Sequence, residues 1–475
     1  MLKRLIFIFT ICCLLSCTER AKQRLNQADT DTVHDRYEPI SDDVLETAII
    51  YEANIRQYSP EGTLAAFTKD ISQLKDLGVK ILWVMPPYPI SMKNRKAKGD
   101  LMVEDIEDEE ERKKYLGSYY AVADYTEINP DLGTKEDFDE MVEMAHANGM
   151  YVILDWVANH TGWDNQWITD HPEYYTMDQD STIIHPAGTD WTDTADLNYD
   201  NPETRFAMRD AMAYWIKEHD IDGYRCDVAH EVPTDFWNAT IKELRTIKPL
   251  FMLAESEKKE LFYEAFDMGY NWEGHHLINQ LAQNKATPKD WHAYMRRNRD
   301  DYQQDDILMN FVTNHDENSW NGTIKERLGD RAEALTVFSY ALPGMPLIYS
   351  GQEYGLDHRL KFFEKDSIPK IKGERYELLK NLGKLKNHHT SLHGGKNPAD
   401  YDPILTDTGL LAFKRGNEGA RIYYLANFTQ APIKTTIPGL SGTIRDMIKG
   451  TEAVLTEATE ITIHPNQYRL LEKAE

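Results

Sequence analysis

The chain has 475 residues, of which 41% are hydrophobic and 28% charged, a composition typical of a soluble globular protein with a large core. Its formal net charge of −26 at pH 7 argues against a nucleic acid partner, because phosphate binding requires clustered lysine and arginine side chains. The 26 tyrosines and 10 tryptophans suit a neutral ligand better, since aromatic rings stack on sugars.

The N-terminal residues indicate export. Two basic residues precede an apolar run, residues 5–15, that is too short to span a membrane permanently, so residues 1–16 are predicted to be a signal peptide. Residues 14–17, Leu-Leu-Ser-Cys, resemble the bacterial lipobox, in which the cysteine is lipidated and the chain is cut before it. We therefore expect Cys17 to anchor the protein to a bacterial envelope membrane, in the periplasm or at the cell surface. An ordinary signal peptide with incidental cysteines is the alternative.

The remaining chain is organised as a tether followed by alternating elements. Residues 17–43 are polar and show no helix or strand period, which predicts a tether. Apolar β-rich runs then alternate with amphipathic stretches, which predicts a parallel sheet with crossover helices. The predicted strands are residues 47–55, 80–87, 151–157, 222–229, 251–256, 265–271, 308–316 and 346–353. Eight strands fit a (β/α)8 TIM barrel over residues 44–390, and a doubly wound sheet is the alternative.

Three segments depart from this alternation. Residues 161–202, after the third predicted strand, are rich in Asp, Trp, Tyr and His and too long for a plain loop, which predicts a small inserted subdomain. Residues 93–115 are a charge run, which predicts a solvated helix. Over residues 395–475, short strands joined by turns predict a C-terminal antiparallel β-sandwich domain.

Acidic residues stand at the C-terminal ends of several predicted strands. They are Asp155, Asp227, Glu255 and Asp316, at the ends of the third, fourth, fifth and seventh strands. In a barrel these ends converge on one mouth, where βα loops build active sites. Arg225 precedes Asp227 by two positions, so their side chains point the same way from a strand. The convergence favours a catalytic role for Asp227 over a purely structural ion pair.

The chemistry that suits several carboxylates is glycoside hydrolysis. One acid protonates the leaving oxygen while another attacks or stabilises the positively charged sugar carbon. The chain shows no His/Cys zinc spacing, no Gly-rich phosphate loop and no nucleophilic serine elbow. A metal-dependent hydrolase is the alternative, but such an enzyme normally shows paired histidines on a strand or helix.

Several motifs resemble, in order, the signature regions of glycoside hydrolase family 13, the α-amylase family. They are DWVANH (155–160), GYRCDVAH (223–230), the glutamate of LAES (255) and FVTNHD (311–316), with GSYYAVADY (117–125) and ADLN (195–198) similar to two further elements. The resemblance spans roughly residues 45 to 390. It implies a retaining hydrolase that cleaves α-1,4-glucosidic bonds in starch-like α-glucans or maltooligosaccharides.

The resemblance also implies a role for each carboxylate. Asp227 would be the nucleophile, Glu255 the general acid and then the base, and Asp316 would bind hydroxyls and stabilise the transition state. Asp155 would orient Arg225, which would keep Asp227 ionised. We expect the guanidinium to lower the pKa of Asp227 and the neighbouring acids to raise the pKa of Glu255.

Further residues are implied to bind the substrate or an ion. His160 and His315 would bond hydroxyls of the sugar being cleaved, and Tyr120 would stack beneath it. Asn159 and Asp196 match positions that bind calcium in many α-amylases, which implies a structural ion, whereas the chemistry itself needs no cofactor.

Two departures from the family pattern leave the specificity open. Ser118 stands where many members have a histidine, and VAHE (228–231) replaces the usual Lys-His pair after the nucleophile. These positions line the cleavage site and the acceptor side in the family. The alternatives are an endo-amylase, an exo-acting or maltogenic glucosidase and a glucanotransferase. A sugar-binding surface protein without activity is disfavoured, because the three catalytic carboxylates are present.

Overall fold

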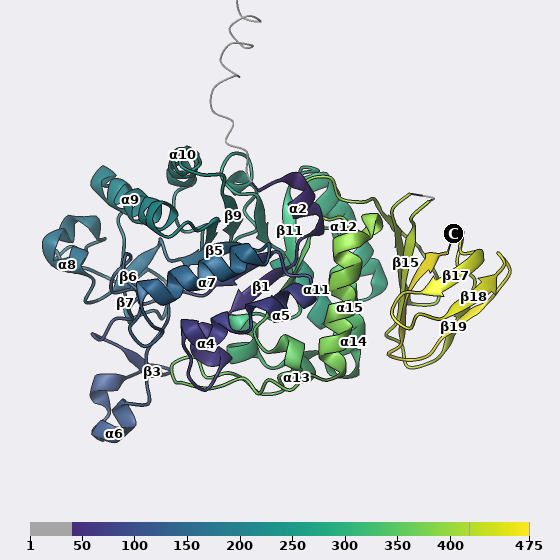
Figure 1. Ribbon diagram of the computed structural model, residues 1–475, viewed down its shortest axis with the longest axis horizontal. Helices are drawn as coiled ribbons and strands as arrows, with labels where there is room; N and C mark the ends of the chain where they lie inside the picture. Colours follow the sequence, from purple (N-terminus) through teal and green to yellow (C-terminus); the bar gives the residue numbers. More distant parts are fainter. Residues whose placement is uncertain (1–39, 418, 475) are drawn as a thin grey trace, which may run out of the picture. The chain divides into compact units, whose positions relative to one another are not determined.

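The computed structural model describes residues 40–417 and 419–474 (Figure 1). The predicted signal peptide, Cys17 and nearly all of the tether lie outside the described residues. Helix α2 (Asp42–Thr47) overlaps the last two residues of the predicted tether. This segment is ordered because it contributes apolar side chains to the core. Ile40 and Leu45 are buried in the same hydrophobic cluster as residues of the barrel strands.

Eight parallel strands close into a barrel in the order β1-β12-β11-β10-β9-β8-β5-β2. Along the chain they are β1 (Ile50–Ala53), β2 (Ile81–Val84), β5 (Tyr151–Trp156), β8 (Gly223–Cys226), β9 (Phe251–Ala254), β10 (Met268–Tyr270), β11 (Ile307–Asn310) and β12 (Met345–Tyr349). Each overlaps one of the eight predicted strands. The predicted TIM barrel is therefore confirmed, and the doubly wound alternative is wrong.

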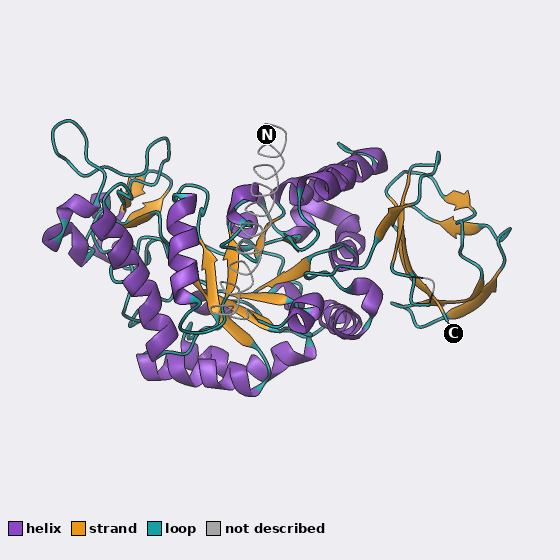
Figure 2. Cartoon of the chain, turned by 90° about the horizontal axis from the view of Figure 1, so that it is seen from above, coloured by secondary structure: helices purple, strands orange, loops and turns teal. Residues whose placement is uncertain are grey.

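Helices surround the strands, as Figure 2 shows. They are α3 (Ile55–Tyr58), α4 (Leu64–Thr68), α5 (Ile71–Asp76), α7 (Lys135–Ala147), α9 (Pro202–Glu218), α10 (Thr234–Leu244), α11 (Trp272–Ala282), α12 (Pro288–Asp301), α13 (Ile324–Leu328), α14 (Ala332–Ala341) and α15 (Glu374–His388). Local sequence fixes their ends. The Thr134 and Asp137 side chains form a capping box at the start of α7, and Pro202 occupies the first turn of α9.

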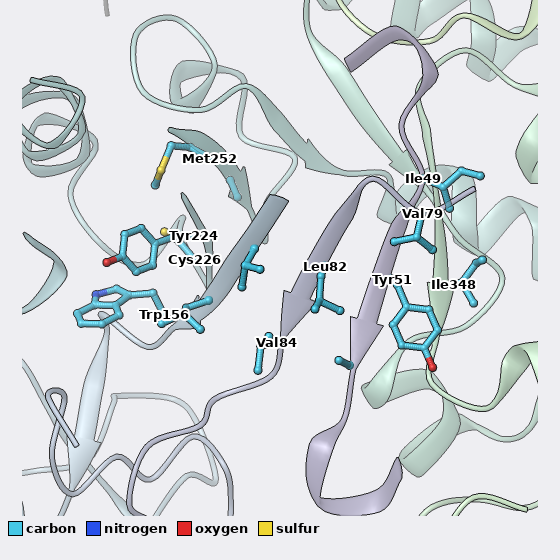
Figure 3. Close-up of a cluster of buried hydrophobic side chains, with 14 of the residues drawn as sticks. Ile49, Tyr51, Val79, Leu82, Val84, Trp156, Tyr224, Cys226, Met252 and Ile348 are labelled. Atoms are coloured by element: carbon cyan, nitrogen blue, oxygen red, sulfur yellow. The ribbon is translucent and has the colours of Figure 1, made fainter. Parts of the chain in front are cut away.

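The strands bury both of their faces. Inside the barrel, Ile50, Trp83 and Ile153 belong to one apolar cluster. On the outside, residues such as Leu82 and Tyr224 belong to a second apolar cluster, part of which Figure 3 shows, and this cluster also contains side chains of the surrounding helices. Because the interior is filled with side chains, the room for a ligand lies at the mouth of the barrel, as in TIM barrels generally.

Two insertions stand on the loops after β2 and β5. The insertion after β5 contains β6 (His160–Gly162), α8 (Gln166–Asp170), the 3-10 turn Pro172–Tyr174 and β7 (Thr194–Asp196), with β6 and β7 paired antiparallel. The charge run after β2 is not the predicted solvated helix. It forms the hairpin β3 (Lys96–Lys98) and β4 (Leu101–Met102), the 3-10 turn Val103–Asp105 and the single exposed turn α6 (Glu109–Arg112).

The C-terminal region is an antiparallel β domain, as predicted. A six-stranded sheet has the order β13 (Tyr401–Pro403), β14 (Leu410–Arg415), β15 (Ile422–Asn427), β20 (Tyr468–Lys473), β17 (Gly442–Asp446) and β18 (Glu452–Leu455). A second pair consists of β16 (Ile433–Thr435) and β19 (Ile461–Ile463). Residues of both sheets, Leu425 and Ile463 among them, share one apolar cluster, while Tyr424 on the other face packs on Phe338 of α14.

Candidate active site

A fully buried guanidinium lies at the centre of the barrel mouth. Nη1 of Arg225, on β8, donates hydrogen bonds to Oδ1 of Asp155 at 2.7 Å and to Oδ1 of Asp227 at 2.8 Å. Its Nη2 forms an ion pair with Oε2 of Glu255 at 2.8 Å, and its Nε donates to the Tyr270 hydroxyl at 3.2 Å. One cation therefore contacts the three carboxylates predicted from strands β5, β8 and β9.

Backbone pairing brings these strand ends together. The Asp227 N–H donates to the Trp156 carbonyl at 2.9 Å, and the Glu255 N–H donates to the Cys226 carbonyl at 3.0 Å. Gly223 makes the close pairing of β8 and β9 feasible, because an added Cβ there would lie 1.8 Å from the Phe251 carbonyl oxygen. The ladder thus continues past the strand ends and places both carboxylates at one mouth.

Val228, directly after Asp227, has a backbone φ of +35°, an unusual value for a β-branched residue. In this conformation its N–H donates a hydrogen bond to Oε2 of Glu255 at 2.9 Å. Unfavourable backbone geometry tends to persist where it serves a site. Here it fixes the orientation of the Glu255 carboxyl, a contact that the sequence did not signal.

Burial sets the protonation of the carboxylates. It raises the pKa of Asp155 and of Asp227 to about 6, although the charge of Arg225 opposes the rise. The expected lowering of the Asp227 pKa is therefore wrong, because desolvation of this fully buried carboxyl outweighs the nearby guanidinium. Burial also raises the pKa of Glu255, to about 7, in the expected direction. Asp227 is thus the more readily ionised of the two.

His315 is held between two acids and a tyrosine. Its Nδ1 bonds to the carboxylate of Glu52 on β1, while its Nε2 lies 2.8 Å from the Tyr120 hydroxyl and 3.2 Å from Oδ2 of Asp316. Burial lowers the pKa of His315, but Asp316 and Glu52 outweigh that effect and the pKa rises to about 9. The ring is therefore an imidazolium at neutral pH. Sequence analysis missed Glu52, although a glutamate inside the apolar run AIIYEANI was a visible signal.

Tyr120 contacts both Asp155 and His315, whereas His160 is a buried, neutral histidine. Tyr120 donates its hydroxyl to Oδ2 of Asp155 at 3.1 Å, and its ring stacks on His315 at 5.5 Å between centroids. Burial lowers the pKa of His160 to about 4, so that ring is neutral. Its Nδ1 lies 3.2 Å from Nδ2 of Asn159. One charged and one neutral histidine thus face the same cavity.

A cavity of about 440 Å³ lies above these groups, within the range of small-molecule sites. Six predicted site residues line it: Tyr120, His160, Asp227, Glu255, His315 and Asp316. Asp155 and Arg225 are fully buried behind this lining. Residues that the sequence analysis missed also line it, namely Lys96, Gly99, Asp190, Trp191, Asp193 and Thr194 from the insertions, and Trp320, Phe362 and Phe363 from later loops. The Asp- and Trp-rich composition of the insertion after β5 was the available signal.

Across residues 40–417 and 419–474, no group of three or more His, Cys, Asp or Glu side chains is placed to hold a metal ion. Within the same residues, none of the helices has the length and apolar character needed to cross a membrane.

Comparison with known proteins gives one consistent result. The family model described as "Alpha amylase, catalytic domain" matches residues 23–191 and 187–384. Alpha-amylase 3 of Dictyoglomus thermophilum is 25% identical over 354 residues, which cover 65% of this chain and 64% of that protein. The maltogenic alpha-amylase of Bacillus acidopullulyticus is 23% identical over 441 residues, which cover 86% of this chain and 70% of that protein.

A solved structure extends the likeness to the whole described fold. The crystal structure of an alpha-amylase from Lactobacillus plantarum superposes with a TM-score of 0.79 at 27% identity. The match covers 91% of this chain and 100% of that one, so the two share the barrel and the C-terminal β domain.

Proposed function

The chain belongs to the α-amylase family, and from this premise we propose that it is a retaining glycoside hydrolase cleaving α-1,4-glucosidic bonds in starch-like α-glucans or maltooligosaccharides. The observation that carries the proposal is the contact of buried Arg225 with three carboxylates beneath a cavity lined by histidines and aromatic rings. Aromatic faces and hydroxyl-binding groups suit a neutral sugar chain.

In the first step Glu255 donates its proton to the glycosidic oxygen while the Asp227 carboxylate attacks the anomeric carbon. Glu255, with a pKa of about 7, retains its proton in a large fraction of molecules at neutral pH. Asp227, with a pKa of about 6, is mostly ionised at the same pH. The C–O bond to the leaving chain breaks, and a covalent glycosyl ester forms on Asp227.

In the second step a water molecule cleaves the ester. Glu255, now a carboxylate, takes a proton from the water, whose oxygen attacks the anomeric carbon and releases Asp227. The two displacements together retain the α configuration. Asp316 and imidazolium His315 line the cavity and would bond sugar hydroxyls as charge develops on the ring.

Turnover of α-glucans tests this proposal directly. We expect short sugars from soluble starch and from maltoheptaose with the wild type, and no detectable release with Asp227→Asn at the same protein concentration. Failure of the wild type to act on either substrate would contradict the proposal. A glucanotransferase would use the same carboxylates with a sugar in place of water, so products longer than maltoheptaose would assign the chain to that class.

Calcium binding by Asn159 and Asp196 stays a prediction. Asn159 directly precedes β6, in which His160 is paired with Asp196 of β7, and the Asn159 carbonyl accepts a hydrogen bond from the Leu197 N–H at 3.1 Å. Calcium takes six to eight oxygen ligands, and these residues supply too few alone, so carbonyl groups and water would have to complete the set. The measurement is the thermal midpoint with and without a chelator, and an unchanged midpoint would contradict a structural calcium ion.

We also propose that the protein is exported and anchored through lipid on Cys17 to a bacterial envelope membrane. The support is the apolar run that ends two residues before this cysteine and the polar stretch that follows it. Labelled palmitate should enter the wild type and not Cys17→Ser, whereas a chain lacking residues 1–17 should remain active and unlabelled. Equal labelling of the wild type and Cys17→Ser would contradict the anchor.

A further inference from the structure

The loops around the barrel mouth differ in how they are connected to one another. Strands β5, β2, β1, β12 and β11 are consecutive neighbours around the closed sheet, so the loops that follow them stand side by side. These loops are joined to one another by hydrogen bonds and ion pairs.

The first junction joins the two insertions. Lys96 of hairpin β3–β4 is buried, and its Nζ donates a hydrogen bond to the Asp190 carbonyl in the insertion after β5. The same ammonium lies 3.9 Å from Oδ2 of Asp190, and both residues line the cavity. Nearby, the Met92 N–H donates to the Asp164 carboxylate at 2.8 Å. The insertions therefore form one side wall.

The second junction joins the loops after β2, β1 and β12. The Leu116 N–H donates to the Phe363 carbonyl at 2.6 Å. Arg56, in the helix after β1, donates to the Gly117 carbonyl at 3.1 Å and also to the Phe362 carbonyl. The wall thus continues around the rim as far as Phe362 and Phe363, which line the cavity.

The third junction joins the loops after β12 and β11. The Leu360 N–H donates to the Asn318 side chain at 2.8 Å, and Arg359 bonds the Glu326 carboxylate at 3.0 Å. The Trp320 ring packs on Phe362 with 5.0 Å between centroids and is 51% exposed. An exposed indole therefore stands at this end of the wall, with a face available for a sugar ring.

The remaining arc of the rim, after β8, β9 and β10, is less built up. Of the described residues, it contributes Asp227, Val228 and Glu255 to the cavity lining, and beyond buried Ala229 on the β8 loop, His230 and Glu231 are exposed. Glu255 stands on this arc. A general acid must face the oxygen of the departing chain, so the leaving group occupies the β8–β10 side and the glycosyl group to be transferred occupies the walled side.

We propose that the joined loops close the glycosyl side of the site, so that the enzyme takes the non-reducing end of an α-glucan and removes a short sugar of fixed length. The inference rests on the proposed function and specifies its substrate class. A chain cannot continue through a wall held by Lys96, Arg56 and Arg359, whereas the leaving chain extends freely past Glu255 on the open arc.

Two labelled substrates separate end-wise from internal cleavage. Both are maltoheptaose with aminopyridine on the reducing end, and one also carries an ethylidene cap on the non-reducing glucosyl unit. We expect the uncapped chain to be shortened by the same unit at each step and the capped chain to persist. Cleavage of both at comparable rates would overturn the inference while leaving the hydrolase assignment intact. Cleavage of neither would refute the proposed function and, with it, this inference.

A matched pair of variants tests the wall itself. Lys96→Ala removes the cation that joins the insertions, and Lys98→Ala removes an exposed lysine from the same strand. We expect the ratio of capped to uncapped cleavage to rise several-fold in Lys96→Ala and to stay at the wild-type value in Lys98→Ala. Equal ratios in both variants would show that the hairpin does not close the site. The wild-type comparison above stands even if Lys96→Ala fails to fold.

Discussion

Arg225 in the barrel and Arg415 in the C-terminal sheet are both almost completely buried, but their partners are of different kinds. Around Arg225, attraction to carboxylates outweighs burial and raises its pKa. Arg415 instead donates to backbone carbonyls, those of Ala341, Leu342, His393 and Ala399. Burial lowers the pKa of Arg415 to about 9, because uncharged oxygens compensate the desolvation only in part.

The difference separates a functional cation from a structural one. The carboxylates around Arg225 lose or gain charge as a reaction proceeds, and the fixed cation stabilises whichever is ionised. Arg415 binds the carbonyls at the C-terminal end of α14, where the helix dipole is negative, and so joins that helix to β14. Changes around Arg225 should therefore alter activity, and changes around Arg415 should alter stability.

The largest expected effect follows from neutralising a carboxylate beside Arg225. Asp227→Asn and Glu255→Gln should each lower kcat about a thousandfold or more, because one removes the nucleophile and the other the proton donor. Thermal midpoints should change little, since the replacements are nearly isosteric. The matched control is Glu218→Gln, an exposed acid at the C-terminal end of α9 that does not line the cavity, which should keep near-normal activity. Turnover at the wild-type rate by either active-site variant would contradict the catalytic role assigned to that residue.

Replacing the structural arginine should give the opposite result. Arg415→Met keeps the apolar stem but leaves four carbonyl contacts unmade, which should lower the free energy of unfolding by about 2–4 kcal/mol. Urea denaturation measures this change, and kcat of the folded variant at low temperature should equal that of the wild type. A lowered kcat with unchanged stability would contradict the comparison.

Activity should depend on pH through the two carboxyls beside Arg225. Asp227 must be ionised, so kcat/KM should fall as the pH drops below its pKa of about 6. Glu255 must be protonated, so kcat/KM should also fall as the pH rises above its pKa of about 7. A bell-shaped profile with its maximum between these values is expected, and Arg415→Met should leave it unmoved. A rate that is flat across this range would contradict both protonation assignments.

The smallest effect should come from the neutral partner of Arg225. Tyr270→Phe removes one hydrogen bond to Nε while the carboxylates still surround the guanidinium. A hydrogen bond to a charged group contributes about 1.5–3 kcal/mol, so kcat/KM should fall about tenfold to a hundredfold, less than in Asp227→Asn. A fall in kcat/KM as large as that of Asp227→Asn would contradict the claim that the carboxylates are the main partners that stabilise the Arg225 guanidinium.

The barrel and most of its mouth were predictable from sequence for a local reason. Each strand is an apolar run bounded by polar residues, so a short stretch of consecutive residues is enough to predict its position. Asp155, Asp227 and Glu255 could be placed in one site because the fold brings all strand ends to one mouth. Their mutual contact through Arg225 follows from that arrangement and from spacing along a single strand.

What the sequence did not predict depends on contacts distant along the chain. Glu52 gains its role from His315, which lies 263 residues away. Lys96 stands in a charge run, and only its contact with Asp190 shows that it is buried in a wall. The pKa of Asp227 is raised, whereas the sequence predicted that it would be lowered. The sequence shows the charged neighbour Arg225 but not the burial that removes water from the carboxyl.

The stereochemistry of the first product tests the central claim most directly. If Asp227 forms a covalent ester that water then opens, the two displacements restore the starting configuration. Proton NMR during the first minutes of maltoheptaose hydrolysis should therefore show the α-anomer accumulating before mutarotation produces the β-anomer. Initial release of the β-anomer would contradict a nucleophilic Asp227 and, with it, the division of roles between the carboxylates around Arg225.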